Sequence, residues 1–74
     1  MSTENTYLER MRNENSELCE RIVKLRAFIS QNSLFRGFTE KKKGLMEGQL
    51  KAMGLYQYFL SQRIEMEQKD INKL

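Results

Sequence analysis

Two heptad-spaced apolar seams, each broken once by a polar residue, constrain the fold of this chain more than any other feature. Both seams advance by alternating steps of three and four residues, the spacing that places side chains along one stripe of a helix. The pattern therefore predicts two amphipathic helices that pack through these stripes. The first seam comprises Leu8, Met11, Asn15, Leu18, Ile22, Leu25 and Ile29, and the second comprises Met46, Leu50, Met53, Gln57, Leu60 and Ile64.

The polar interruptions, Asn15 and Gln57, predict how the two helices pair. When the chain folds back about a turn near residues 32–38, the seams come into antiparallel register with Leu8 opposite Ile64. Asn15 then faces Gln57, and the two amides form one shared polar layer. Buried amides lower stability but fix register and partner number. A register-setting role for this pair is favoured over ligand binding for that reason.

The limits of the helices follow from the residues that break or cap them. The chain has 74 residues and no proline, which suits one small domain built of long helices. The first helix lacks glycine, and Thr39 is a good N-cap for the second. The fold class we predict is all-α, a two-helix antiparallel coiled-coil hairpin. Its parts are a frayed N-terminus at residues 1–5 and a single domain at 6–74, with a helix at about 6–31, a basic apolar turn at 32–39 and a helix at about 40–70.

The second helix carries another apolar stripe beside its seam. A hairpin of this size cannot cover both stripes, and small domains often complete their core by oligomerisation. We therefore predict a homo-oligomeric helical bundle, a dimer or higher. Gly44, Gly48 and Ala52 recur at four-residue spacing, which either lets another backbone or a ligand come close or is simply tolerated. The candidate interface residues are Leu45, Gly48, Ala52, Leu55, Phe59 and Met66.

The net charge of +3 is unevenly distributed. Residues 1–20 contain five acidic and two basic residues, whereas residues 21–43 contain seven basic residues and one acidic residue. The positive excess near the turn favours an anionic partner there, and a merely solvated basic turn is the alternative. The turn leads into the N-terminus of the predicted second helix, which favours anions. Arg36 is suited to bind a phosphate there, and Phe38 is suited to stack on a base. The candidates are Arg36, Phe38, Lys41, Lys42 and Lys43.

A second candidate site lies at the open end of the predicted hairpin. The seam register brings Tyr7 near Arg63, with Arg10 one turn further along the first helix. An aromatic ring beside two guanidinium groups suits a nucleobase and its phosphate. The alternative is a tyrosine that covers a helix end beside solvated arginines.

The residue types that the chain lacks limit its chemistry. It has no histidine and one cysteine, so His-based acid–base catalysis and thiolate zinc sites are excluded. We therefore predict no enzyme, no metal and no cofactor, and we interpret Cys19 as a packed side chain in a reducing compartment. No apolar run is long enough to span a bilayer and no signal peptide opens the chain, which predicts a cytoplasmic protein without a membrane partner.

Three stretches of the sequence resemble a family of short helical proteins of phages and prophages. They are Tyr7-x-x-Arg10-Met11, Leu18-x-x-Arg21-x-x-Lys24-Leu25-x-Ala27-Phe28-Ile29, and Gln49-Leu50-Lys51-Ala52-Met53-x-x-Tyr56-x-x-x-Leu60-x-x-Arg63. These proteins are often labelled as related to a crAss-like phage product, and the resemblance covers about residues 7–66. They are similar to anti-CBASS sponges, which are oligomeric helical proteins that sequester cyclic nucleotide signals without degrading them.

The resemblance implies a phage counter-defence sponge that binds a cyclic nucleotide in the host bacterial cytoplasm. Helix packing does not explain four of the matched residues, so the resemblance implies that these bind the ligand. Tyr7 would contact a base, and the basic residues would contact phosphates. The turn is the least similar part and gains no support from the resemblance. The implied ligand-binding residues are Tyr7, Arg10, Lys24 and Arg63.

Two other functions remain as alternatives. One is a protein–protein inhibitor or adaptor that docks on a host defence protein through apolar side chains. The other is weak, salt-sensitive, non-specific nucleic-acid binding through the basic turn. The modest net charge and the acidic first helix disfavour an extended nucleic-acid surface. The candidate docking residues are Leu34, Phe35, Phe38, Tyr56 and Phe59.

Overall fold

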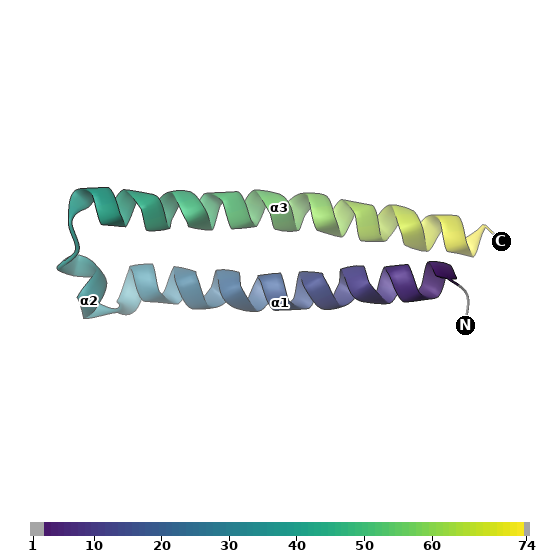
Figure 1. The fold of residues 1–74 in the computed structure, drawn as a ribbon, viewed down its shortest axis with the longest axis horizontal. Coiled ribbons are helices and arrows are strands. Elements are labelled where there is room, and N and C mark those ends of the chain that lie inside the picture. Colours follow the sequence, from purple (N-terminus) through teal and green to yellow (C-terminus); the bar gives the residue numbers. More distant parts are fainter. Residues whose placement is uncertain (1–2, 74) are drawn as a thin grey trace.

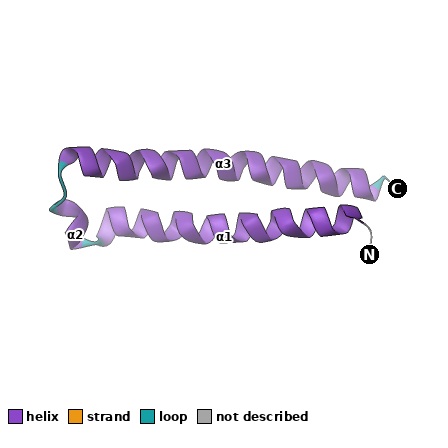
Figure 2. Ribbon diagram, viewed as in Figure 1, coloured by secondary structure: helices purple, strands orange, loops and turns teal. Residues whose placement is uncertain are grey.

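The computed structural model describes residues 3–73 of the chain and shows two long helices folded side by side (Figure 1). The helices run antiparallel, and the molecule is a rod of 54 × 17 × 15 Å. No strand is present among residues 3–73 (Figure 2). The predicted all-α fold and the packing of the two long helices on each other are therefore confirmed. The elements are α1 (Thr3–Gln31), α2 (Ser33–Arg36) and α3 (Glu40–Asn72).

The helix limits differ from the predicted ones by a few residues. α1 begins at Thr3 instead of residue 6, and α3 continues to Asn72 instead of residue 70. Neither extension contains glycine or proline, so nothing in the sequence stops the helices there. Residues 1–2 of the segment predicted to fray lie outside the described residues.

The predicted turn contains a short helix of its own. Asn32 ends α1 and caps α2, because its side-chain oxygen accepts a hydrogen bond of 2.9 Å from the backbone N–H of Leu34. α2 ends at Arg36, and the C-cap residue Gly37 has a φ of −85°, an ordinary right-handed value. The freedom of glycine is therefore not used at this position. The first residues of the predicted turn thus form one more turn of helix.

The core lies along the two predicted seams. Leu8, Met11, Leu18, Ile22 and Leu60 form the buried cluster, and Leu60 is the most enclosed with 1% of its surface exposed. Partly buried residues from α3 pack around this cluster. One of them, Ile71, extends the seam of α3 by a further heptad beyond Ile64, which explains why α3 continues past residue 70. These residues are Leu50, Met53, Ile64 and Ile71.

The two polar seam residues face each other as the register requires. Gln57 Nε2 donates a hydrogen bond of 3.3 Å to Asn15 Oδ1, and the pair is partly buried. The bond satisfies one polar group of each amide within an otherwise apolar interface. That this pair sets the register, rather than accompanying it, stays a prediction.

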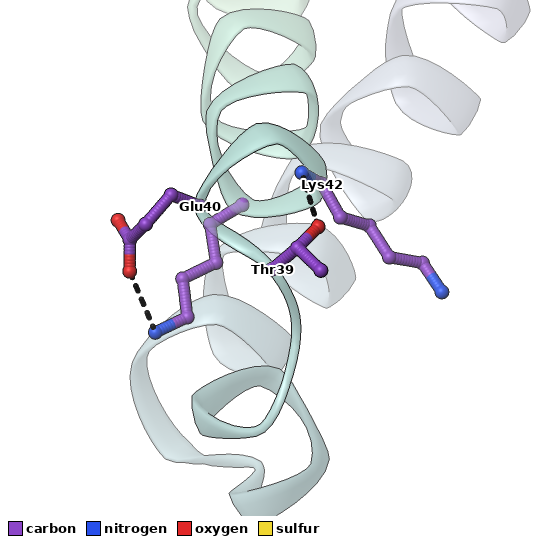
Figure 3. Close-up of polar contacts among 4 residues, drawn as sticks. Thr39, Glu40 and Lys42 are labelled. Atoms are coloured by element: carbon purple, nitrogen blue, oxygen red, sulfur yellow. Dashed lines mark hydrogen bonds and ion pairs between the residues drawn. The ribbon is translucent and has the colours of Figure 1, made fainter.

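Three phenylalanines close the turn end of the hairpin. Phe28 from α1, Phe35 from α2 and Phe38 from the loop before α3 have ring centroids 6.0–6.4 Å apart. α2 carries Phe35 back against α1, and this ring is buried. The predicted N-cap is present at the start of α3, where Thr39 Oγ1 accepts a hydrogen bond of 3.2 Å from the backbone N–H of Lys42 (Figure 3).

The second apolar stripe of α3 lies on the face that α1 does not cover. Its large members, Leu45, Leu55, Phe59 and Met66, are each 56–66% exposed. A Cβ added at Gly44, Gly48 or Gly54 would meet no atom within 4 Å. The stripe therefore plays no part in the core of a single hairpin, and the self-association inferred from it stays a prediction.

Candidate functional site

The register of the seams places a tyrosine and an arginine together at the open end of the hairpin. Tyr7 precedes the buried Leu8 on α1, and Arg63 precedes Ile64 on α3. Arg63 Nη2 donates a hydrogen bond of 2.6 Å to Tyr7 Oη. Both side chains are exposed, with 41% of Tyr7 in contact with solvent. The predicted neighbours are therefore in direct contact on the surface.

Arg10 adds a second guanidinium group to this end of the molecule. It follows Tyr7 by three positions and so lies on the same side of α1. The side chain is exposed. Among the side chains of residues 6–73, neither Arg10 nor Arg63 forms an ion pair. We call Tyr7, Arg10 and Arg63 the open-end cluster. It presents one aromatic ring and two positive charges to solvent.

A different arginine has a structural role nearby. Arg12 Nη2 on α1 donates a hydrogen bond to Gln68 Oε1 on α3, and Gln68 Nε2 donates one of 3.2 Å to Asn72 Oδ1. The first contact ties the two helices together close to the chain ends, and the second lies within α3. The seam register alone did not single out this pair, because neither residue belongs to a seam. Arg10 and Arg12 are therefore neighbours in sequence with different surroundings.

Lys24 lies far from the open-end cluster. It is 17 residues after Tyr7 on the same helix, which corresponds to about 25 Å. The four residues implied by the family resemblance are thus split between the two ends of one hairpin. Lys24 lines an open groove of about 340 Å³ at the turn end, together with Ala27, Phe28, Gln31 and Asn32.

Sequence reasoning did not single out this groove. Lys24, Phe28 and Gln31 follow one another at helical spacing, so the sequence alone could have placed them on one face of the helix. What the spacing did not reveal is that Phe28, which lies outside the seam, packs in the aromatic cluster of the turn. This arrangement leaves α1 with a hollowed surface just before the chain turns.

Two lysines of the basic turn are engaged by the aromatic cluster. Lys42 Nζ lies 4.2 Å from the ring centroid of Phe38, and Lys43 Nζ lies 5.7 Å from that of Phe35. Lys43 also forms an ion pair of 3.7 Å with Glu40 (Figure 3). Cation–π contacts of this kind stabilise the turn itself. Within the described part of the chain, they give these lysines a structural role beside any binding role.

The remaining candidates of the turn differ in their availability. Arg36 and Lys41 are exposed and take part in no described ion pair or cation–π contact. Phe38 is half-buried, and its ring already stacks with Phe28 at 6.0 Å and lies under Lys42. A base that stacked on Phe38 would have to compete with these contacts. The basic turn therefore offers charges more readily than a stacking surface.

The apolar docking patch is divided by the structure. Leu34, Tyr56 and Phe59 are exposed, whereas Phe35 is packed inside the turn. The buried Phe35 is therefore not part of the surface that Leu34, Tyr56 and Phe59 present. A host protein that used all five predicted residues would have to open the aromatic cluster.

Other features of the described chain bear on function. Residues 3–73 contain no group of three His, Cys, Asp or Glu side chains placed to hold a metal ion. No helix in this range combines the length and the apolar character needed to cross a membrane. Cys19 is a free, partly buried thiol, in keeping with the packed position expected for it.

The sequence matches a known protein family over most of its length. The family model described as Sequestin covers residues 5–66, a range that includes the open-end cluster and Lys24. This range agrees with the resemblance over residues 7–66, and the family name fits a protein that sequesters another molecule. No curated protein and no solved structure matches the chain.

Proposed function

The chain belongs to the Sequestin family, and we propose that it is a phage counter-defence sponge that binds a cyclic nucleotide immune signal. The protein holds the signal without cleaving it and so lowers the free concentration that reaches the host effector. The phage origin, the crAss-like relationship and the location in the host bacterial cytoplasm are parts of this proposal. Family membership supports sequestration, and the open-end cluster supports the choice of ligand.

The observation that carries the ligand assignment is the hydrogen bond between Arg63 and Tyr7. It holds a guanidinium group beside an aromatic ring at the surface. Guanidinium groups bind phosphate oxygens through two parallel hydrogen bonds, and aromatic faces bind nucleobases by stacking. Arg10 adds a second positive charge on the same side of α1. A phosphate-bearing molecule with a base matches this set of groups.

Sequestration places limited demands on the site. Binding must be tight relative to the concentration of the signal, and the bound molecule must leave unchanged. The open-end cluster provides charge and a stacking surface, which are sources of affinity. Release of intact ligand is therefore the property that separates this proposal from an enzyme that degrades the same signal.

The test combines binding with recovery of the ligand. Thermal shift and isothermal titration are measured with a panel of cyclic dinucleotides and trinucleotides, with linear dinucleotides as controls. We expect at least one cyclic nucleotide to raise the Tm, and chromatography after heat denaturation to return it intact. Absence of binding to every panel member at millimolar concentration, or recovery of a cleaved product, contradicts the proposal.

A further inference from the structure

The available basic residues at opposite ends of one hairpin are too far apart to bind one small ligand together. Arg63 belongs to the open-end cluster, whereas the exposed Lys41 lies at the turn end of the same helix. The 22 positions between them correspond to about 33 Å along α3. A cyclic nucleotide cannot reach both. Any site that uses both ends requires a second molecule.

The outer face of α3 offers a surface for that second molecule. Of the nine large hydrophobic side chains that are exposed in the described part of the chain, six belong to α3. Leu45, Leu55, Phe59 and Met66 follow one another at heptad-like spacing and extend over most of the helix. A long apolar stripe on a helix that already packs through its opposite side indicates a second packing partner.

The order of large and small residues along this stripe fits a second copy of the same helix. In an antiparallel pairing centred between Met53 and Gly54, Ala52 lies opposite Leu55 of the partner subunit. Gly48 then lies opposite Phe59 of the partner subunit. Space over Gly48 is open in the single hairpin. Leu55 and Phe59 of each copy thus enter the spaces above small residues of the other, and the two-fold symmetry forms each contact twice.

The charge distribution favours the same orientation. The turn end contains residues 21–43, with seven basic residues and one acidic residue. The open end contains residues 1–20, with five acidic and two basic residues. An antiparallel pair places the acidic open end of each copy beside the basic turn end of the other. A parallel pair would instead place the two basic ends together, which is unfavourable.

This pairing also brings the two separated cations together. Arg63 of one copy falls level with Gly44 and Leu45 of the partner subunit, and Lys41 of the partner subunit lies one helical turn further on. Tyr7 accompanies Arg63 because the two are hydrogen-bonded. Two positive charges in proximity repel each other unless an anion lies between them. The pair of hairpins therefore contains two equivalent places where a phosphate would relieve repulsion.

We propose that a second copy of this chain covers the outer face of α3 in this antiparallel pairing. The nucleotide then binds between Tyr7 and Arg63 of one subunit and Lys41 of the partner subunit. The pairing stands on packing and charge alone, whereas the nature of the ligand rests on the function proposed above. Each dimer contains two such sites, and a single hairpin contains none that is complete.

The pairing is tested by sedimentation equilibrium without ligand. Wild type is expected to sediment as a dimer or as a larger assembly built on this pair. Gly48→Leu fills the space that Phe59 of the partner subunit needs and is expected to weaken association at least tenfold. Gly54→Leu is the matched control, since Gly54 is equally open in the hairpin but lies outside the stripe. Circular dichroism checks that both variants remain helical.

Two results would overturn the pairing. One is a wild-type chain that is a folded monomer at a protein concentration of about 100 μM, because a specific dimer with a micromolar dissociation constant would be formed there. The other is equal association of the Gly48→Leu and Gly54→Leu variants. Neither result depends on which nucleotide the protein binds, or on whether it binds one.

The shared site is tested by mixing two variants that are each defective. Arg63→Ala removes the guanidinium group, and Lys41→Glu places a negative charge against the phosphate while keeping a residue suited to a helix N-terminus. In a mixed dimer, one site combines the intact Lys41 of the first variant with the intact Arg63 of the second. With random exchange, about one quarter of the wild-type binding capacity should return, as expected for a two-fold dimer.

The probe for this experiment is 3′,3′-cyclic GMP–AMP, titrated by calorimetry with sedimentation of each variant as a control for assembly. Recovery of capacity on mixing supports a site shared between subunits. Binding by wild type without recovery on mixing overturns the shared site and leaves the proposed function standing. Absence of binding by wild type overturns the shared site for this nucleotide, and absence across the whole panel overturns the proposed function as well.

Discussion

At the open end of the hairpin an arginine meets an aromatic side chain edge-on through a hydrogen bond, whereas at the turn end lysines lie over aromatic rings. Arg63 donates to the hydroxyl of an exposed Tyr7. Lys42 and Lys43 lie 4.2 and 5.7 Å from the ring centroids of Phe38 and Phe35. The two ends thus combine the same kinds of residues in different ways.

The difference indicates different roles for the two ends. At the turn, the rings pack on one another and the lysines cover them, so the contacts are satisfied within the chain. At the open end, the tyrosine and both arginines remain exposed to solvent. Composition alone would favour the turn as the binding site because it contains more positive charge. The contacts instead favour the open end, with Arg36 and Lys41 as the candidate residues of the turn that remain available.

The largest expected effect comes from the core beneath the open-end cluster. Leu60 is the most buried side chain, so Leu60→Ala is expected to lower the free energy of unfolding by about 3 kcal/mol. The open end should then lose its fixed geometry while the aromatic turn is less affected. Urea denaturation measures the change. Val23→Ala, at a side chain that is 60% exposed, is the control and should change stability by less than about 0.5 kcal/mol.

The next effect concerns the ligand and tests the comparison directly. Arg63→Ala is expected to weaken binding of the cyclic nucleotide by about 10- to 100-fold, because a charge-assisted contact to phosphate is lost. Lys43→Ala, which removes a charge of the same sign from the turn, is expected to leave binding within about twofold. Calorimetry measures both dissociation constants. If the Lys43 variant is the weaker binder, the ligand belongs at the turn and the assignment of roles is reversed.

A smaller effect is expected at the polar layer between the two ends. Replacing Asn15 and Gln57 together with leucine removes the partly buried amide pair and is expected to raise stability by about 1–2 kcal/mol. The same change should broaden the distribution of oligomers, because the seam then lacks its polar register. Denaturation and native mass spectrometry give the two readouts. A less stable double variant would show that the amide bond contributes more than apolar packing at this level.

The sequence allowed the seams, the antiparallel register and the contact of Tyr7 with Arg63 to be predicted, because all three follow from heptad spacing. Spacing fixes which residues lie on one stripe, and two interrupted stripes have few ways to match. Ile71 was missed because the seam was ended at Ile64, although the same spacing continues to residue 71.

The turn could not be predicted in the same way. Its structure depends on contacts among three phenylalanines from three segments, and heptad spacing says nothing about these. Asn32 directly follows the predicted first helix, yet its side chain also caps the start of α2. Heptad spacing also says nothing about the contact between Phe38 and Phe28. Phe38 was therefore expected to be free for a nucleobase and is instead packed against Phe28. Local signals identified the residues of this region but not their partners.

The smallest expected effect separates the structural role of the turn lysines from a binding role. Lys42→Met retains an apolar side chain over Phe38 but removes the charge, so the free energy of unfolding should fall by about 0.5–1 kcal/mol. Lys41→Met, which removes a charge that lies on no aromatic ring, should leave the unfolding free energy nearly unchanged and weaken ligand binding instead. Chemical denaturation and calorimetry on the two variants measure these opposite patterns. Equal effects of both substitutions on the free energy of unfolding would mean that stability depends only on the total charge of the turn. The two lysines would then have no distinct structural and binding roles.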